Sequence, residues 1–198
     1  MIDNWNHPPP RKGILGALDR FIGPGATRPE AGLQVVLPII AAIAAPLHAR
    51  NVAADWSAVQ YIICAGLAFD IAGGIVTNST SAGKRWYHRQ GQTIWKHLSF
   101  ASLHLLHLMI VSWIYLGWNV SWLVISGGVL ILLATAILAV PHYLQRPVAA
   151  AAYTSAFLVS IYVLESPQGL EWFLPLFFLK LLMCHLVKEE PYQPKVTG

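Results

Sequence analysis

The chain has 198 residues, of which 56% are hydrophobic and only 11% are charged, with a mean hydropathy of +0.53 and a formal net charge of +4. Soluble domains carry about 25% charged residues, so this composition excludes an ordinary water-soluble protein and predicts an all-α, polytopic integral membrane protein. The basic residues are divided among short connections, which favours contacts with anionic lipid headgroups over a nucleic-acid partner.

Residues 1–30 form a polar, proline-rich segment without the apolar run of a cleaved signal peptide. Within this segment, apolar residues recur at helical spacing over Gly13–Gly23, which predicts a short helix lying in the membrane interface. We expect this segment to be cytoplasmic. The only cysteines, Cys64 and Cys184, lie in apolar runs and are expected to pack as small hydrophobic side chains.

Residues 31–187 are predicted to form the transmembrane domain, and residues 188–198 a cytoplasmic tail. Spanning helices need about 20 apolar residues each. Six runs are candidates, the first kinked or tilted by Pro38 and Pro46: Ala31–Leu47, Ser57–Val76, His97–Trp118, Ser121–Val140, Val148–Leu164 and Gly169–Val187.

The distribution of Lys and Arg orients these six spans. Four of the 13 basic residues precede the first span, four lie between the second and third, one lies between the fourth and fifth, and two follow the sixth. The opposite side holds only Arg50, and Lys180 lies inside the last span. An 11-to-1 excess is the positive-inside pattern, so we expect both termini in the cytoplasm and a multi-pass protein of the inner (plasma) membrane.

This topology places four ionisable side chains in the cytoplasmic half of the membrane. At 1.5 Å per residue, Asp70 lies about 9 Å from the inner face, His104 and Lys180 about 10 Å, and His107 about 15 Å. A charged side chain at such depth is costly and usually faces a partner. We therefore predict that Asp70 lies within direct or one-water reach of His104 or His107, with the adjacent glycines, Gly73 and Gly74, allowing close helix approach.

The leading functional hypothesis is a metal-dependent enzyme that acts on a lipid or another hydrophobic substrate. Asp70, His104 and His107 would bind Zn or Fe, because two histidines with one carboxylate leave open positions for substrate. His97 or His185 would complete the set.

Three alternatives are left open. His97 and His185, which match in depth, would ligate haem axially. Asp70, the histidines and Lys180 would act without metal, as acid–base groups or a proton relay. In the third alternative, the protein is a non-catalytic membrane subunit whose polar side chains only form hydrogen bonds between helices.

The longest polar connection, Thr77–Lys96, contains four basic residues, three Trp or Tyr residues and no acid. It is interpreted as a basic aromatic membrane anchor or as a binding loop for an anionic headgroup or phosphate. The candidate ligands in the second case are Asn78, Lys84, Arg85, His88 and Arg89.

Overall fold

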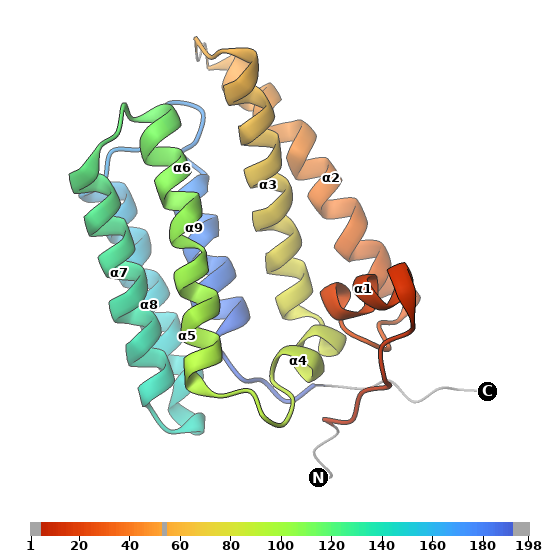
Figure 1. Ribbon diagram of the computed structural model, residues 1–198. Helices are drawn as coiled ribbons and strands as arrows, with labels where there is room; N and C mark the ends of the chain where they lie inside the picture. Colours follow the sequence, from red (N-terminus) through yellow and green to blue (C-terminus); the bar gives the residue numbers. More distant parts are fainter. Residues whose placement is uncertain (1–4, 53–54, 192–198) are drawn as a thin grey trace.

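The computed structural model describes residues 5–52 and 55–191, and 75% of this part of the chain is helical, with no strand in it. Its elements are α1 (Gly13–Ile22), α2 (Arg28–Asn51), α3 (Ala58–Ser79), α4 (Ser81–Tyr87), α5 (Ile94–Leu103), α6 (Leu105–Tyr115), α7 (Val120–Ala139), α8 (His142–Tyr162), α9 (Phe173–Phe178) and the π-helix η1 (Leu179–His185). The long helices run side by side as a bundle, and α1 lies across one end of it (Figure 1).

Within the described residues, four helical segments are long and apolar enough to cross a membrane, namely α2, α3, α5 with α6, and α7. The fold is therefore compatible with a membrane protein. α8 is long but less apolar, and α9 with η1 spans only 13 residues, about 20 Å of helix against a hydrocarbon core of about 30 Å.

Two capped helices, α2 and α3, form the hairpin on one side of the bundle. Thr27 with Glu30, and Ser57 with Gln60, form capping boxes that satisfy the first backbone amides of α2 and α3. α2 covers little of the core, because eight of its large apolar side chains are at least 40% exposed. Such a continuous apolar surface is typical of a helix that faces lipid.

The predicted span His97–Trp118 is not one helix. It begins earlier, at Ile94, and is divided at His104, where the backbone (φ −73°, ψ −7°) leaves the regular helix between α5 and α6. The His104 amide binds the carbonyl of Ala101 instead of that of Phe100. The loop predicted after α3 also differs from the structure, since it contains the short helix α4.

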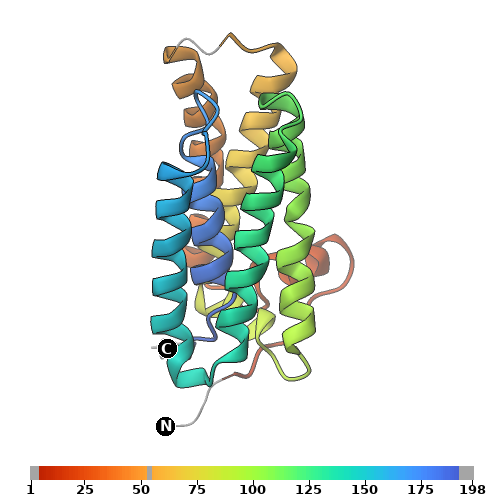
Figure 2. The same cartoon turned by 90° about the vertical axis from the view of Figure 1, so that its left-hand side faces the viewer.

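The last apolar segment is the centre of the fold. Phe173, Phe177, Phe178, Leu181 and Leu182 are at most 1% exposed. This segment packs against α3, α7 and α8 (Figure 2). The predicted regular helix Gly169–Val187 is replaced by the short α9 and by η1, where the amide of Leu186 binds the carbonyl of Leu181, five residues earlier. π-Helical turns of this kind are frequent at functional sites.

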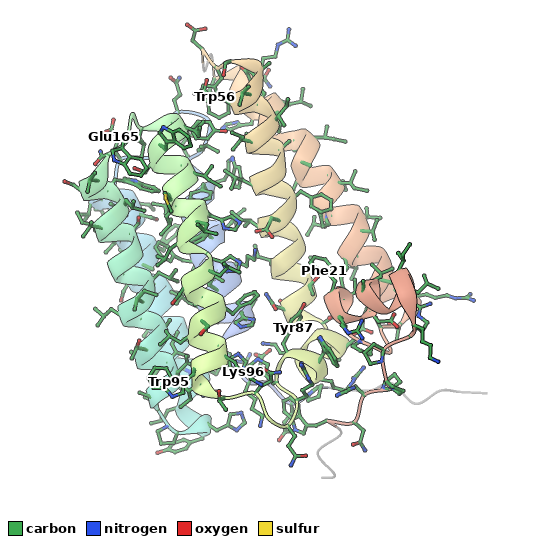
Figure 3. The ribbon with its side chains drawn as sticks, in the orientation of Figure 1. Phe21, Trp56, Tyr87, Trp95, Lys96 and Glu165 are labelled. Atoms are coloured by element: carbon green, nitrogen blue, oxygen red, sulfur yellow. The ribbon has the colours of Figure 1, made fainter. Side chains whose placement is uncertain are left out.

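Aromatic residues mark both ends of the bundle. Trp56 lies at one end, and Trp95 with Lys96 lies at the other (Figure 3). Both ends of the described chain also lie at this second end, because the Lys188 ammonium sits 4.7 Å from the ring centre of Trp5.

The predicted helix at Gly13–Gly23 is present as α1, in which the apolar residues Ile14 and Phe21 are 90% and 55% exposed. Asp19 fixes the preceding chain by accepting hydrogen bonds from the backbone and guanidinium of Arg11. These bonds lower the pKa of Asp19 to about 2. α1 packs on α4, where a Cβ on Gly23 would lie 2.4 Å from the carbonyl carbon of Ala82.

We predict that Gly23→Ala loosens α1 from α4. Both Gly23 and Gly91 have positive φ, +90° and +84°, so an alanine at either costs about 1–2 kcal/mol in backbone strain. Only Gly23 adds a clash, because nothing lies within 4 Å of a Cβ at Gly91. Hydrogen exchange should accelerate over residues 13–22 in Gly23→Ala and stay unchanged there in Gly91→Ala; equal behaviour of the two variants would contradict the close packing.

Candidate functional site

A partly open cavity of about 380 Å³ lies between α3, α5, α6 and η1, and we call it the Asp70 pocket. Phe21 of α1 and Tyr87 of α4 contribute to its wall, and these two side chains lie close to each other at one end of the bundle (Figure 3). Its lining comprises Phe21, Asp70, Gly74, Thr77, Asn78, Tyr87, Phe100, Leu103, His104, Leu106, His107 and Lys180. The four groups that the sequence predicts to lie within the membrane, Asp70, His104, His107 and Lys180, thus line one cavity.

Asp70 is the hub of this pocket. His107 Nε2 donates a hydrogen bond to Asp70 Oδ2 at 3.0 Å, and Lys180 Nζ donates to the same oxygen. The predicted pairing of Asp70 with a histidine of the third span is therefore found, with His107 as the partner and not His104. Lys180 is only 2% exposed, so Asp70 provides the counter-charge for a buried ammonium.

The two glycines after Asp70 have separate packing roles. A Cβ at Gly74 would lie 2.2 Å from Lys180 Cε, so the absence of a side chain there leaves the space that the lysine occupies. A Cβ at Gly73 would lie 3.2 Å from Pro38 on α2. Gly74 thus allows close packing of α3 against η1, and Gly73 allows close packing of α3 against α2.

His104 is held in one tautomer. Its Nδ1 lies 2.8 Å from the carbonyl oxygen of Phe100, which can only accept, so Nδ1 carries the hydrogen and Nε2 has a free lone pair. This Nε2 forms no hydrogen bond within the described residues. The ring stacks on His107 with a centroid distance of 5.0 Å. In His107, Nδ1 is buried and has no partner in the same part of the chain.

The donors are not arranged as a metal site. Over residues 5–52 and 55–191, no group of three or more His, Cys, Asp or Glu side chains has the geometry to hold a metal ion. Asp70 directs one oxygen to both Lys180 and His107, and His104 directs Nδ1 to its own helix. The side chains predicted to bind Zn or Fe, those of Asp70, His104 and His107, thus do not direct their donor atoms to one common position.

His97 and His185 belong to a second cluster, which we call the histidine chain. His97 Nδ1 lies 3.3 Å from His185 Nε2, and His185 Nδ1 lies 3.3 Å from Asn78 Oδ1. His88 donates from Nε2 to the carbonyl oxygen of His185 and stacks on His97. Since His97 and His185 touch directly, this conformation leaves no gap between them for the haem predicted as an alternative.

Lys84 and Arg85 of α4 are both buried. Each is 3% exposed. Lys84 Nζ donates to the carbonyl oxygens of Cys184 and Val187, at 2.7 and 2.6 Å, and burial lowers the pKa of Lys84. The Nε and Nη1 atoms of Arg85 are buried without partners among the described residues. Lys84 therefore has internal partners in this structure, and the role of the two residues as phosphate ligands stays a prediction.

Two further candidates in this connection are His88, which is buried, and Arg89, which is partly exposed. His88 and Arg89 line a second cavity, at the end of the bundle that holds α4. The Arg89 guanidinium lies 3.8 Å from the centre of the Trp86 ring and donates to the Trp86 carbonyl. Sequence reasoning missed Phe21, Tyr87 and Lys188 as cavity residues. For Phe21, the helical spacing of apolar residues in α1 was the sequence feature that could have indicated packing against the bundle.

No family model, curated protein or solved structure matches this chain. The chemistry of the site therefore rests on geometry. A neutral imidazole with a free lone pair, beside a buried ammonium that is paired with a partly exposed carboxylate, is able to accept a proton while the ammonium stabilises developing negative charge.

We predict that Asp70→Asn lowers the free energy of unfolding by about 3–5 kcal/mol, because it leaves the Lys180 ammonium buried without a counter-charge. Asp70→Asn with Lys180→Met should recover most of that loss. Glu171→Gln is the matched control, since its partner His48 is half exposed and such pairs contribute at most about 1 kcal/mol. Unfolding in mixed micelles measures all three; a double variant as unstable as the single one would refute the pairing.

We predict that Lys84→Met lowers the free energy of unfolding by about 2–4 kcal/mol, because two hydrogen bonds from a charged group are lost. Lys12→Met, at an exposed lysine, should leave stability within about 0.5 kcal/mol. If Lys84 were instead a headgroup ligand, its loss would weaken binding to anionic vesicles and leave stability unchanged.

Proposed function

We propose that the protein crosses the inner membrane six times, with both termini in the cytoplasm. Besides the four apolar segments, α8 and the pair α9–η1 run along the bundle as two further rods (Figure 2). An even number of crossings agrees with Trp5 and Lys188 lying together at one end. The 11-to-1 excess of Lys and Arg supports the cytoplasm as the side of that end.

The function that the geometry supports best is acid–base chemistry on a lipid or another hydrophobic molecule held in the Asp70 pocket. Apolar walls with a few convergent polar groups are typical of a small-molecule site. Here Phe100, Leu103 and Leu106 supply apolar surface, while Asn78, His104 and Lys180 supply polar groups. Ionisable residues within spanning helices usually mark functional pathways.

One observation carries this proposal, namely the free Nε2 lone pair of His104. His104 is the proposed base that accepts a proton from the polar end of the substrate. Lys180 would stabilise the negative charge that develops, and Asp70 would hold Lys180 and His107 in position. A metal-dependent version with Zn or Fe requires Asp70 and His107 to leave their present partners.

The second candidate is a non-catalytic membrane subunit. The observation that favours it is the pairing of Asp70 with both His107 and Lys180, which joins α3, α6 and η1. The two candidates differ in the role of His104, because its free nitrogen stabilises nothing within the bundle.

We predict that membranes from cells that produce the wild-type chain differ in at least one hydrophobic metabolite from membranes that contain His104→Gln. Glutamine keeps a polar group but cannot act as a base, so a step that needs proton transfer should slow by about 100-fold or more. Mass spectrometry of membrane extracts, at matched protein levels, detects the depleted substrate and the accumulated product.

His48→Gln is the matched control, because His48 lies away from the Asp70 pocket and is half exposed; it should reproduce the wild-type extract. Metal analysis of the same preparations distinguishes the metal-dependent version of the proposal, which requires bound Zn or Fe, from the metal-free one. Identical extracts from wild type, His104→Gln and cells without the protein would refute the enzyme proposal and leave the non-catalytic subunit.

A further inference from the structure

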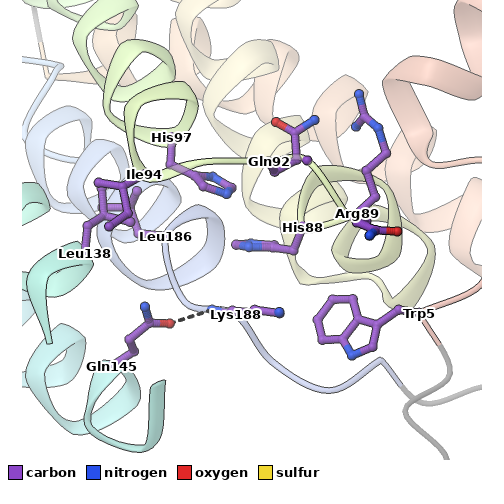
Figure 4. Close-up of a pocket in the computed structure, with 12 residues that line it drawn as sticks. Trp5, His88, Arg89, Gln92, Ile94, His97, Leu138, Gln145, Leu186 and Lys188 are labelled. Atoms are coloured by element: carbon purple, nitrogen blue, oxygen red, sulfur yellow. Dashed lines mark hydrogen bonds between the residues drawn. The ribbon is translucent and has the colours of Figure 1, made fainter. Parts of the chain in front are cut away.

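The second cavity, which we call the terminal cavity, has a volume of about 480 Å³ and lies at the end of the bundle near α4 (Figure 4). It is lined by Trp5, His88, Arg89, Gln90, Gly91, Gln92, Ile94, His97, Leu138, Gln145, Leu186 and Lys188. It shares no lining residue with the Asp70 pocket, so it is a separate site.

The charged side chains in this lining are positive. Among the described residues that line the cavity are two cations, Arg89 and Lys188, and no carboxylate. The nearby Glu189 is directed elsewhere, with its oxygens 3.9 Å from Lys84 Nζ and 4.0 Å from Arg146 Nε. The Lys188 ammonium contacts the Trp5 ring and has no ion pair within the described chain. An unpaired ammonium beside a cavity is a ready partner for an anion.

The two imidazoles add hydrogen-bond acceptors to these cations. His88 uses Nε2 to donate to the His185 carbonyl, which leaves the Nδ1 lone pair free. Burial lowers the pKa of His88 to about 3, and the neighbouring Lys84 and Lys188 contribute, so His88 is neutral at pH 7. His185 donates from Nδ1 to Asn78 Oδ1, so its Nε2 is an acceptor. His97 therefore donates to it from Nδ1, and the Nε2 of His97 keeps a free lone pair.

A ligand that satisfies this lining must present negative charge to the cations and hydroxyl donors to the imidazoles. Gln92 and Gln145 provide further amide groups. We propose that the terminal cavity binds a phosphate ester that carries free hydroxyl groups, of the glycerol phosphate type. The same chemistry occurs in a soluble ester and in the headgroup of phosphatidylglycerol. This proposal is independent of the function assigned to the Asp70 pocket.

Native mass spectrometry of the full chain in detergent tests the proposal with defined probes. The soluble probes are glycerol 3-phosphate and ethyl phosphate, which lacks the hydroxyls. The lipid probes are dioctanoyl phosphatidylglycerol and dioctanoyl phosphatidylcholine. Each is titrated against wild type, Lys188→Gln and Lys12→Gln. Lys188→Gln removes no hydrogen bond of its ammonium within the described chain, and thermal unfolding of both variants checks that they are folded.

We expect Lys188→Gln to weaken binding of the hydroxyl-bearing probe by about tenfold, since one charge-assisted contact is lost. Lys12→Gln, which removes an exposed cation away from the cavity, should bind as wild type does. Binding of glycerol 3-phosphate identifies a soluble ester as the ligand, and binding of phosphatidylglycerol alone identifies a lipid headgroup. Failure of both to bind, equal binding of probes with and without hydroxyls, or equal effects of the two variants would overturn the proposal.

Discussion

The buried ammonium of Lys180 is the constraint on which much of this fold depends. A charge removed from water is tolerated only when an opposite charge and hydrogen bonds lie close to it. Asp70 provides that charge from α3, and Gly74 leaves the space for the lysine stem. The pair therefore fixes how α3 and η1 pack, and His107 adds α6 to the same carboxylate.

The buried carbonyls at the end of η1 impose a second requirement of the same kind. Carbonyl groups at the end of a helix lack partners in the helix, and buried ones must find donors elsewhere. Lys84 donates to Cys184 and Val187, and His88 donates to His185. The short helix α4 thus acts as a cap for the central helix, which explains why it is buried although its sequence is polar.

Sequence reasoning predicted the helical class and the shared depth of Asp70, His104, His107 and Lys180, because apolar run length and the positive-inside pattern constrain both. It did not predict which histidine meets Asp70. That choice depends on the irregular backbone at His104, where no Pro or Gly marks the interruption.

Lys84 shows a different limit of sequence reasoning. A basic residue in a polar connection is normally solvated, and the groups that hold Lys84 are backbone carbonyls, which every residue carries. No side-chain pattern could therefore distinguish the buried Lys84 from the exposed Lys96 in the same connection.

The two cavities are separate in their lining yet joined by a line of hydrogen bonds. Asn78 lines the Asp70 pocket and contacts His185, which contacts His97, and His97 lines the terminal cavity. The line runs from α3 through η1 to α5, the same three elements that position Lys180 and His104 in the pocket. Because each link joins two different elements, a shift of η1 that altered the Lys180–Asp70 pair would also displace the His185 contacts at the terminal cavity. The hydrogen bonds of His185 to Asn78 and His97 thus connect the polar linings of the two cavities through η1.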